Sequence, residues 1–308
     1  MNRRNLLLGA LLIPATTAMA ACGGGDLLST DSVTDAAGDS ATIVVGSANF
    51  PESEVLAEMY AQILESKGLS VQRRFSIGSR EIYVKALQDG SIDLIPEYNG
   101  ALLTYLAGDQ EVDALTTQDV QAALQDRLPA GLTLLQPAQA QDKNEVVVTA
   151  ETARKYQLST IADLAPHAAD FVIGAGPEFQ ERRQGLVGLR EVYGLTFSSF
   201  TALDAGGPIT IQALKQDRVH VASLLSTDPA IQLNGFVRLT DPENLFGVQN
   251  VLPLVRTAKN DDTVSAALNK LAAVLTTEDL TAALGRLTID HDSIADIAAD
   301  YLRDEQLV

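Results

Sequence analysis

Apolar residues recur along most of this chain at two spacings, one typical of strands and one typical of helices. A short apolar run at 42–46 is followed, after Pro51, by apolar residues at helical spacing up to Gly68. The same pattern then predicts a strand at 70–75, a helix at 80–87 and a strand at 92–95. Strands that alternate with helices in this way predict a parallel sheet covered by helices.

The alternation begins again after a loop rich in Gln, Ala and Asp at 137–143. Further strands are predicted at 145–149, 171–175, 198–201 and 220–225, with helices between them. After a strand at 250–256 the chain ends in three helical runs with no strand between them. Such a tail cannot form a domain of its own, so we expect it to pack on the first α/β unit.

This order predicts an α/β protein of two lobes that are joined by a double hinge, with a ligand cleft between them. The expected segments are 1–21 (signal peptide), 22–41 (flexible tether), 42–142 (lobe 1), 143–251 (lobe 2) and 252–308 (return to lobe 1).

The N-terminus has the pattern of a secretory signal peptide. Arg3 and Arg4 precede an apolar run at 6–13, and small residues lead to Cys22, the only cysteine. We predict that Cys22 is lipidated and anchors the mature protein to the extracytoplasmic face of the membrane. Cleavage after Ala20 or Ala21 with a free thiol is the alternative, and the paired arginines permit either Sec or twin-arginine export.

The charge and composition of the chain limit the kinds of partner that it can have. The chain has 22 basic and 40 acidic residues, a formal charge of −18. Loss of Arg3 and Arg4 with the signal would leave a formal charge of −20, which argues against nucleic acid as a partner.

Residues 23–41 are mostly small and polar, and as a flexible tether they would reach roughly 25 Å. We expect a monomer.

Polar side chains follow the third predicted strand directly. Pro96, which has no backbone N–H to continue a sheet, is expected to end the strand, and Glu97, Tyr98 and Asn99 come next. Ligands of open α/β sheets bind beyond the carboxyl ends of the strands. We therefore predict a small-molecule site here, with a simple polar turn as the alternative.

The residues offer little for catalysis or metal binding. The three histidines, His167, His220 and His291, are widely spaced and match no metal-ligand pattern, so no metal and no cofactor is predicted. Ser226 follows a strand and could serve a hydrolase as nucleophile. The preferred interpretation is that Ser226, Thr227 and Asp228 cap the next helix and contact a ligand.

Two arginines follow predicted strand ends, Arg80 in the first unit and Arg182 in the second. Either could meet an anionic group of a ligand, or form an ion pair between the lobes. For Arg182, a solvated charge run that is balanced by its own glutamates is an equal alternative. We predict that Tyr98 and Arg182 face each other across the cleft.

The chain resembles a known family, the substrate-binding proteins of osmoprotectant ABC importers, which bind glycine betaine, carnitine and choline. The motifs that carry the resemblance are Ser47–Glu52 (SANFPE), Ile92–Gly100 (IDLIPEYNG), Glu178–Arg182 (EFQER) with Gly185–Leu189 (GLVGL) and Tyr193–Leu195 (YGL), Ser226–Asp228 (STD) and Pro253–Arg256 (PLVR). The resemblance runs from about Thr42 to the C-terminus. It implies a periplasmic-binding-protein fold and delivery of a solute to a permease with a cytoplasmic ATPase.

The chain departs from the family at the ligand. Members hold a trimethylammonium head in an aromatic cage, and only Tyr98 fills one of the four cage positions here; the others fall on Glu145, Leu225 and the Gln249–Asn250 pair. We therefore expect weak binding of glycine betaine and a solute that depends more on hydrogen bonds.

The predicted function is thus a receptor, not an enzyme, for a small polar solute. Alternatives are an exported hydrolase that uses Ser226, and a lipoprotein that acts as scaffold or sensor. The predicted ligand-binding residues are Asn49, Phe50, Ser79, Arg80, Glu97, Tyr98, Asn99, Glu145, Phe179, Arg182, Ser226, Thr227, Asp228 and Asn250.

Overall fold

The computed structural model describes residues 41–308 apart from 109, 111–113 and 115, as one compact unit. The predicted signal peptide, Cys22 and all of the tether except Ala41 lie outside the described residues. No helix of the described part is long and apolar enough to cross a membrane.

Two five-stranded sheets organise the described unit, and each defines one lobe. The first lobe contains the sheet β2-β1-β3-β10-β4 and the second the sheet β7-β6-β8-β5-β9. The strands of the first lobe are β1 (Ile43–Gly46), β2 (Val71–Arg74), β3 (Leu94–Tyr98), β4 (Leu132–Leu134) and β10 (Val251–Arg256). Those of the second are β5 (Asn144–Val148), β6 (Val172–Ala175), β7 (Ser199–Ala202), β8 (Val221–Leu225) and β9 (Val237–Arg238).

Parallel pairing is confined to the strands that the alternation predicted to be parallel. In the first lobe β1 pairs in parallel with β2 and β3, whereas β10 runs antiparallel to β3 and β4. In the second lobe β6 is parallel to β7 and β8, and β5 is antiparallel to β8. In both sheets the antiparallel pairing includes the strand that enters from the other lobe.

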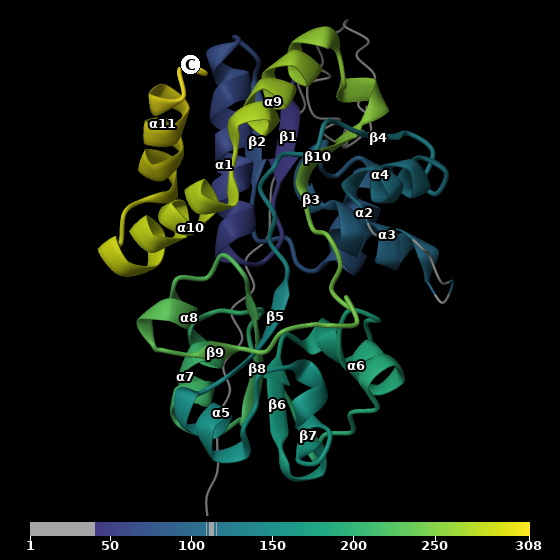
Figure 1. The fold of residues 1–308 in the computed structure, drawn as a ribbon. Coiled ribbons are helices and arrows are strands. Elements are labelled where there is room, and N and C mark those ends of the chain that lie inside the picture. The colour runs from purple at the N-terminus through teal and green to yellow at the C-terminus, as the bar shows by residue number, and fades with distance from the viewer. Residues whose placement is uncertain (1–40, 109, 111–113, 115) are drawn as a thin grey trace, which may run out of the picture. The chain divides into compact units, whose positions relative to one another are not determined.

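Helices cover both faces of the first sheet (Figure 1). Alternate residues of β1 point to opposite faces, so Val45 packs with the helices of one face and Val44 with those of the other. One face carries α1 (Pro51–Ser66), α9 (Asp262–Val274), α10 (Thr277–Gly285) and α11 (Ile294–Asp304), and the other carries α2 (Arg80–Asp89), α3 (Asn99–Ala107) and α4 (Thr117–Gln125).

The second sheet is covered in the same way, since Val146 and Val148 pack on one face and Val147 on the other. Its helices are α5 (Ala150–Tyr156), α6 (Leu186–Tyr193), α7 (Pro208–Lys215) and α8 (Ala230–Leu233), with 3₁₀ turns at Ile161–Leu164, Ala168–Asp170 and Pro177–Gln180.

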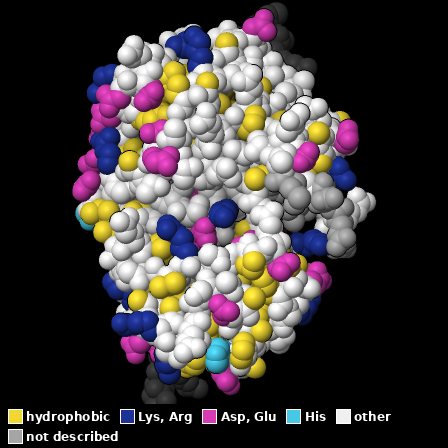
Figure 2. All heavy atoms as spheres, viewed as in Figure 1, with side chains coloured by type: hydrophobic (Ala, Val, Ile, Leu, Met, Phe, Trp, Pro, Cys, Tyr) yellow, Lys and Arg dark blue, Asp and Glu magenta, His cyan; other side chains and the backbone are white. Residues whose placement is uncertain are grey.

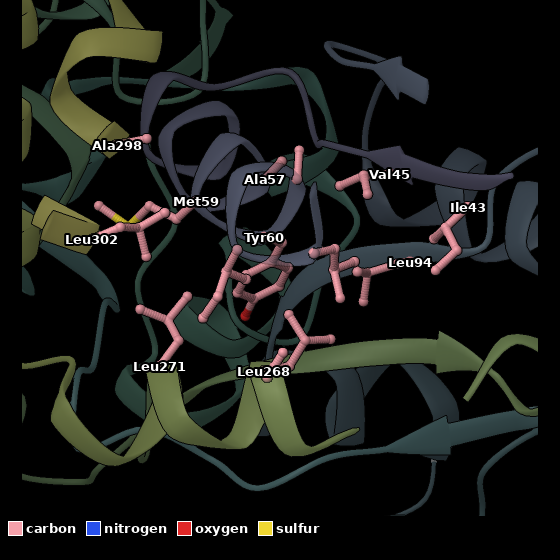
Figure 3. Packing of buried hydrophobic residues seen from close by; sticks show 14 of the residues in the cluster. Ile43, Val45, Ala57, Met59, Tyr60, Leu94, Leu268, Leu271, Ala298 and Leu302 are labelled. Carbon is pink, nitrogen blue, oxygen red and sulfur yellow. The ribbon is translucent and has the colours of Figure 1, made fainter. Parts of the chain in front are cut away.

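The C-terminal helices complete the core of the first lobe. Leu268 and Leu271 of α9 and Leu302 of α11 are fully buried around α1, where Tyr60 lies in the middle of the cluster (Figure 3). The predicted segment boundaries remain a prediction, but this packing supports the return of 252–308 to the first lobe.

The expectation that Pro96 ends its strand is wrong. Strand β3 continues to Tyr98, and Pro96 lies opposite Pro253 of β10. Two prolines cannot exchange N–H···O bonds, so this pair occupies a position of the antiparallel ladder that does not need them. On the other side β1 has already ended at Gly46, and the absent donor of Pro96 therefore leaves no partner unsatisfied there.

Candidate functional site

A cavity of about 820 Å³ lies where residues of both lobes meet. The first lobe contributes the turn before α1, the start of α2, Tyr98 and one face of α3; the second contributes the loop after β6 and the end of β8. Lys and Arg side chains lie beside Asp and Glu side chains in the middle of the face shown in Figure 2. The cavity lies beyond strand ends of both lobes.

The predicted ligand-binding residues divide into two groups. The cavity lining includes Asn49, Phe50, Ser79, Arg80, Tyr98, Phe179 and Arg182. It does not include Glu97, Asn99, Glu145, Ser226, Thr227, Asp228 and Asn250. Each residue of the second group has a partner within the protein.

Glu97 holds Arg80 in place from inside the first lobe. Its fully buried carboxylate accepts hydrogen bonds from Arg80 Nε at 2.5 Å and Nη2 at 3.0 Å, and from the Tyr83 hydroxyl at 2.8 Å. A buried carboxylate needs such a set of donors to offset its lost hydration. Glu97 therefore orients Arg80 and has no oxygen left for a solute.

The two asparagines connect β3 to the crossover that leads into β10. The side-chain oxygen of Asn99 accepts from the backbone N–H of Asn250 at 2.8 Å, and Asn250 Nδ2 donates to the carbonyl of Ala138 at 2.9 Å. The second crossover lies beside the first, because Gln141 forms a β-bridge with Asn250. These amides satisfy backbone groups at the hinge.

The segment after β8 contacts the first crossover and, through Thr227, the first lobe. The Ser226 hydroxyl donates to Asp142 at 3.0 Å, and the Thr227 hydroxyl donates to Glu52 of α1. Asp228 caps α8 by accepting from the backbone N–H of Ala230 at 2.8 Å. The capping role predicted for this motif is thus observed at Asp228.

Glu145 is not part of the cavity lining. Its carboxylate lies 3.8 Å from Lys143 Nζ, a long distance for an ion pair, and Lys143 itself lines the cavity. Burial raises the pKa of Glu145.

Two buried carboxyl groups, Glu52 and Asp142, lie close together at the hinge. Glu52 also accepts from the Tyr98 hydroxyl at 2.7 Å. Burial, and then the neighbouring charge of Asp142, raises the pKa of Glu52 well above its usual range. Burial raises the pKa of Asp142 to about 6. The pair is best accommodated when at least one carboxyl is protonated.

Tyr98 and Arg182 both line the cavity, from the first and the second lobe respectively. Their polar groups, however, are already engaged by the first lobe. The Tyr98 hydroxyl donates to Glu52, and Arg182 donates through Nε to Glu81 Oε1 at 3.1 Å and through Nη2 to Glu81 Oε2 at 3.0 Å. Arg182 thus forms the interlobe ion pair that was one of its two predicted roles.

More aromatic rings reach the cavity than the sequence motifs suggested. Besides Phe50, Tyr98 and Phe179, the lining includes Tyr83 and Tyr105. The ring centroids of Phe50 and Tyr98 are 6.0 Å apart. An aromatic ring attracts a desolvated cation when the cation lies over the face of the ring.

Tyr105 was missed although its position carries a signal. Ala101, Thr104, Tyr105 and Gly108 line the cavity at the spacing of one helical face, directly after the motif that contains Tyr98. Leu225 and Gln249, which occupy predicted cage positions, also line the cavity. Glu81 and Asp142 had no signal of their own, because their roles depend on partners far away in the sequence.

Metal binding is not indicated in the part of the chain that the structure describes, where no group of three or more His, Cys, Asp and Glu side chains could hold an ion. The site offers instead aromatic faces, amides and paired charges. Such a lining suits a small organic solute.

Comparison with known proteins adds independent information. A family model described as the substrate binding domain of ABC-type glycine betaine transport systems matches residues 41–304. The glycine betaine-binding protein YehZ of Escherichia coli is 25% identical over 85% of this chain and 90% of its own length. A glycine-betaine-binding protein of Pseudomonas aeruginosa is 26% identical over 87% of this chain and 89% of its own.

Solved structures show the same fold. A glycine betaine/carnitine/choline ABC transporter protein superimposes with a TM-score of 0.66 and 22% identity, and the match covers 86% of this chain and 99% of that one. The prediction of a two-lobed α/β binding-protein fold is confirmed.

Proposed function

This chain belongs to the family of substrate-binding domains of ABC-type glycine betaine transport systems, and from that premise we propose that its cavity binds a small osmoprotectant-like solute with a quaternary ammonium head. The family consists of binding proteins that deliver solutes to ABC importers outside the cytoplasm. The predicted resemblance and the predicted receptor role are confirmed. The hydrolase alternative has no support, and the Ser226 hydroxyl is held by Asp142.

The aromatic lining of the cavity is the observation that supports this class of solute. Phe50, Tyr98, Tyr105 and Phe179 come from three different segments and reach one space between the lobes. Two of the curated relatives are named as glycine betaine-binding proteins. A methylated ammonium group has no N–H to donate, so it is held by ring faces and by charge.

The polar groups that line the cavity indicate which other functional groups the solute has besides its ammonium head. Ser79, Asn144, Ser223 and Gln249 line the cavity, and most of their hydroxyl and amide groups already have a protein partner: Ser79 Oγ donates to Glu81, Ser223 Oγ to Asn144 Oδ1 and Gln249 Nε2 to the carbonyl of Phe246. The oxygens of the two hydroxyls can still accept a hydrogen bond, so a solute with a hydroxyl could donate to them. We propose that the solute combines the ammonium head with hydrogen-bonding groups, and that glycine betaine is a weak ligand.

Calorimetric titration of the purified full chain tests the proposal. Choline, carnitine, glycine betaine and a panel of hydroxylated compounds are the titrants, and we expect at least one solute of the trimethylammonium group to bind with a stoichiometry of one and without conversion. Tyr105→Ala should weaken that binding by about 2- to 30-fold, the contribution of one ring face. Tyr156→Ala, at a tyrosine that does not belong to the cavity lining, is the control for loss of a tyrosine.

Absence of binding by every titrant, with the protein folded, would refute the proposed solute class. Low-micromolar binding of glycine betaine would refute its predicted weakness as a ligand. A small molecule that copurifies with the protein and is seen by native mass spectrometry would identify the natural solute directly.

The proposed location follows from the N-terminal pattern together with the family. We infer that Cys22 is the lipidated first residue of the mature protein and that the tether holds the receptor near its permease and ATPase. A monomer is sufficient for this role, because one copy carries both lobes of the cavity.

A further inference from the structure

Two of the arginines that line the cavity, Arg80 in the first turn of α2 and Arg182 in the loop after β6, already hold a carboxylate of the protein. Arg80 is bound by Glu97, and Arg182 is bound by Glu81. In each pair Nε and Nη2 donate to the two different carboxylate oxygens. This is the two-pronged geometry in which a guanidinium would bind the carboxylate of a solute.

The two pairs differ in how easily a solute could replace the protein's carboxylate. Glu97 is fully buried and has Tyr83 as a further donor, so its pair with Arg80 is fixed. Arg182 and Glu81 come from opposite lobes, and their side chains are 27% and 42% exposed. The Arg182 guanidinium is therefore where a solute carboxylate and a protein carboxylate would compete.

The surroundings of Glu81 favour it over a solute carboxylate as the partner of Arg182. Its Oε2 accepts a second hydrogen bond, from Ser79 Oγ at 2.5 Å, and it lies in the first turn of α2, where the helix favours a negative charge. Partial burial raises the pKa of Glu81, but the hydrogen bonds from Arg182 and Ser79 lower it to about 2. The group is thus charged at any physiological pH.

We propose, on the basis of the proposed function, that Glu81 is a specificity-determining residue that occupies the carboxylate site on Arg182 and so disfavours solutes that carry a carboxylate. A solute carboxylate would have to displace Glu81 from Arg182. Glu81 would then lie at the cavity as a charge without its partner, which is unfavourable and so disfavours solutes that carry a carboxylate. A solute that ends in a hydroxyl does not meet this competition.

The other charges of the wall are mixed: Glu178 and Glu181 would repel a carboxylate, whereas Lys143 and Arg183 would attract one. The proposed discrimination rests on Glu81, which occupies the Arg182 guanidinium. The receptor should therefore distinguish two solutes that share the trimethylammonium head, choline with its hydroxyl and glycine betaine with its carboxylate.

The test is titration of the full chain with choline and glycine betaine, in wild type and in three variants whose folding is checked by thermal melting. Wild type should bind choline about tenfold more tightly than glycine betaine. Glu81→Gln should raise the affinity for glycine betaine about tenfold and change that for choline less than about threefold. In the double variant Glu81→Gln/Arg182→Gln the gain should disappear, because it requires the freed guanidinium.

Asp89→Asn is the matched control, since it removes one negative charge from the other end of α2 while its side-chain oxygen can still accept from Ser91. It should leave both affinities unchanged. Equal affinity of wild type for the two solutes, no gain in Glu81→Gln, or a gain that persists in the double variant would each overturn the inference alone. Failure of both solutes to bind folded wild type would overturn the proposed function together with it.

Discussion

The carboxyl group of Asp142 illustrates how one residue can couple the hinge to pH. It is buried at the first crossover, accepts from Ser226 Oγ and from the backbone N–H of Thr227 at 3.2 Å, and lies close to Glu52. Burial of a carboxyl group disfavours its charged form, and a second carboxyl group nearby adds to the cost. The hinge is therefore expected to be less stable where both groups are ionised.

We predict that Asp142→Asn stabilises the protein at pH 7.5 more than at pH 4.5. Between pH 3.8 and about 6 the folded protein binds more protons at this residue than the unfolded chain does, so the free energy of unfolding falls as the pH rises through that window. The shift corresponds to about 3 kcal/mol at most. The amide cannot ionise but keeps an oxygen for Ser226.

Urea unfolding at the two pH values measures the difference. Asp126→Asn, at an exposed aspartate after α4, is the control and should alter the free energy of unfolding equally at both. An Asp142→Asn effect that is independent of pH would contradict the prediction.

At the scale of elements, the last helix is a part of the first lobe's core and not an appendage. Ile297, Ala298 and Leu302 of α11 are buried in the cluster around α1 (Figure 3). Gln62 of α1 donates to the backbone carbonyl of Ala295 at 2.9 Å, which fixes the two helices side by side. The start of α1 carries Glu52, so this packing also supports the hinge contacts.

Leu302→Ala should therefore lower the free energy of unfolding by about 2 to 5 kcal/mol, because the side chain is fully buried and its loss leaves a cavity. Ile289→Ala, at a position 48% exposed in the turn before α11, should cost much less. Chemical denaturation of both variants gives the comparison. Equal effects would mean that α11 does not belong to the cooperative core.

At the scale of the whole molecule, the receptor role requires that the two lobes reach one solute and that the protein stays near its permease. The lobes contact each other through Thr227 with Glu52 and through Arg182 with Glu81. Arg182 and Glu81 line the cavity, so a solute that binds there adds to an existing interlobe interaction.

Retention at the membrane is predicted to depend on Cys22. Two acyl chains would hold the protein firmly, since each buried CH₂ contributes ~0.8 kcal/mol, whereas one chain is marginal. Cell fractionation should find wild type with the membrane and Cys22→Ala in the soluble fraction. Met19→Leu, which brings the preceding residues closer to the usual cleavage box, should remain membrane-bound; Cys22→Ala at the membrane would contradict the lipid anchor.

The order of strands and helices could be predicted from the sequence, because periodicity is a local property. The motif after 92–95 and the loop with Arg182 were each predicted to line a cavity for a related reason, since ligands of α/β sheets bind beyond the carboxyl ends of the strands, and both line the observed cavity. The family motifs added the receptor role. These features could be predicted because each depends on only a few residues that are neighbours in the sequence.

What only the tertiary structure decided are the pairings between distant segments. Pro96 continues its strand because it faces Pro253, and Arg182 is neutralised by Glu81, 101 residues away. Tyr105 reaches the solute cavity because α3 turns that face toward it. A buried charge or ring takes its properties from whatever surrounds it in space, and the local sequence does not contain that information.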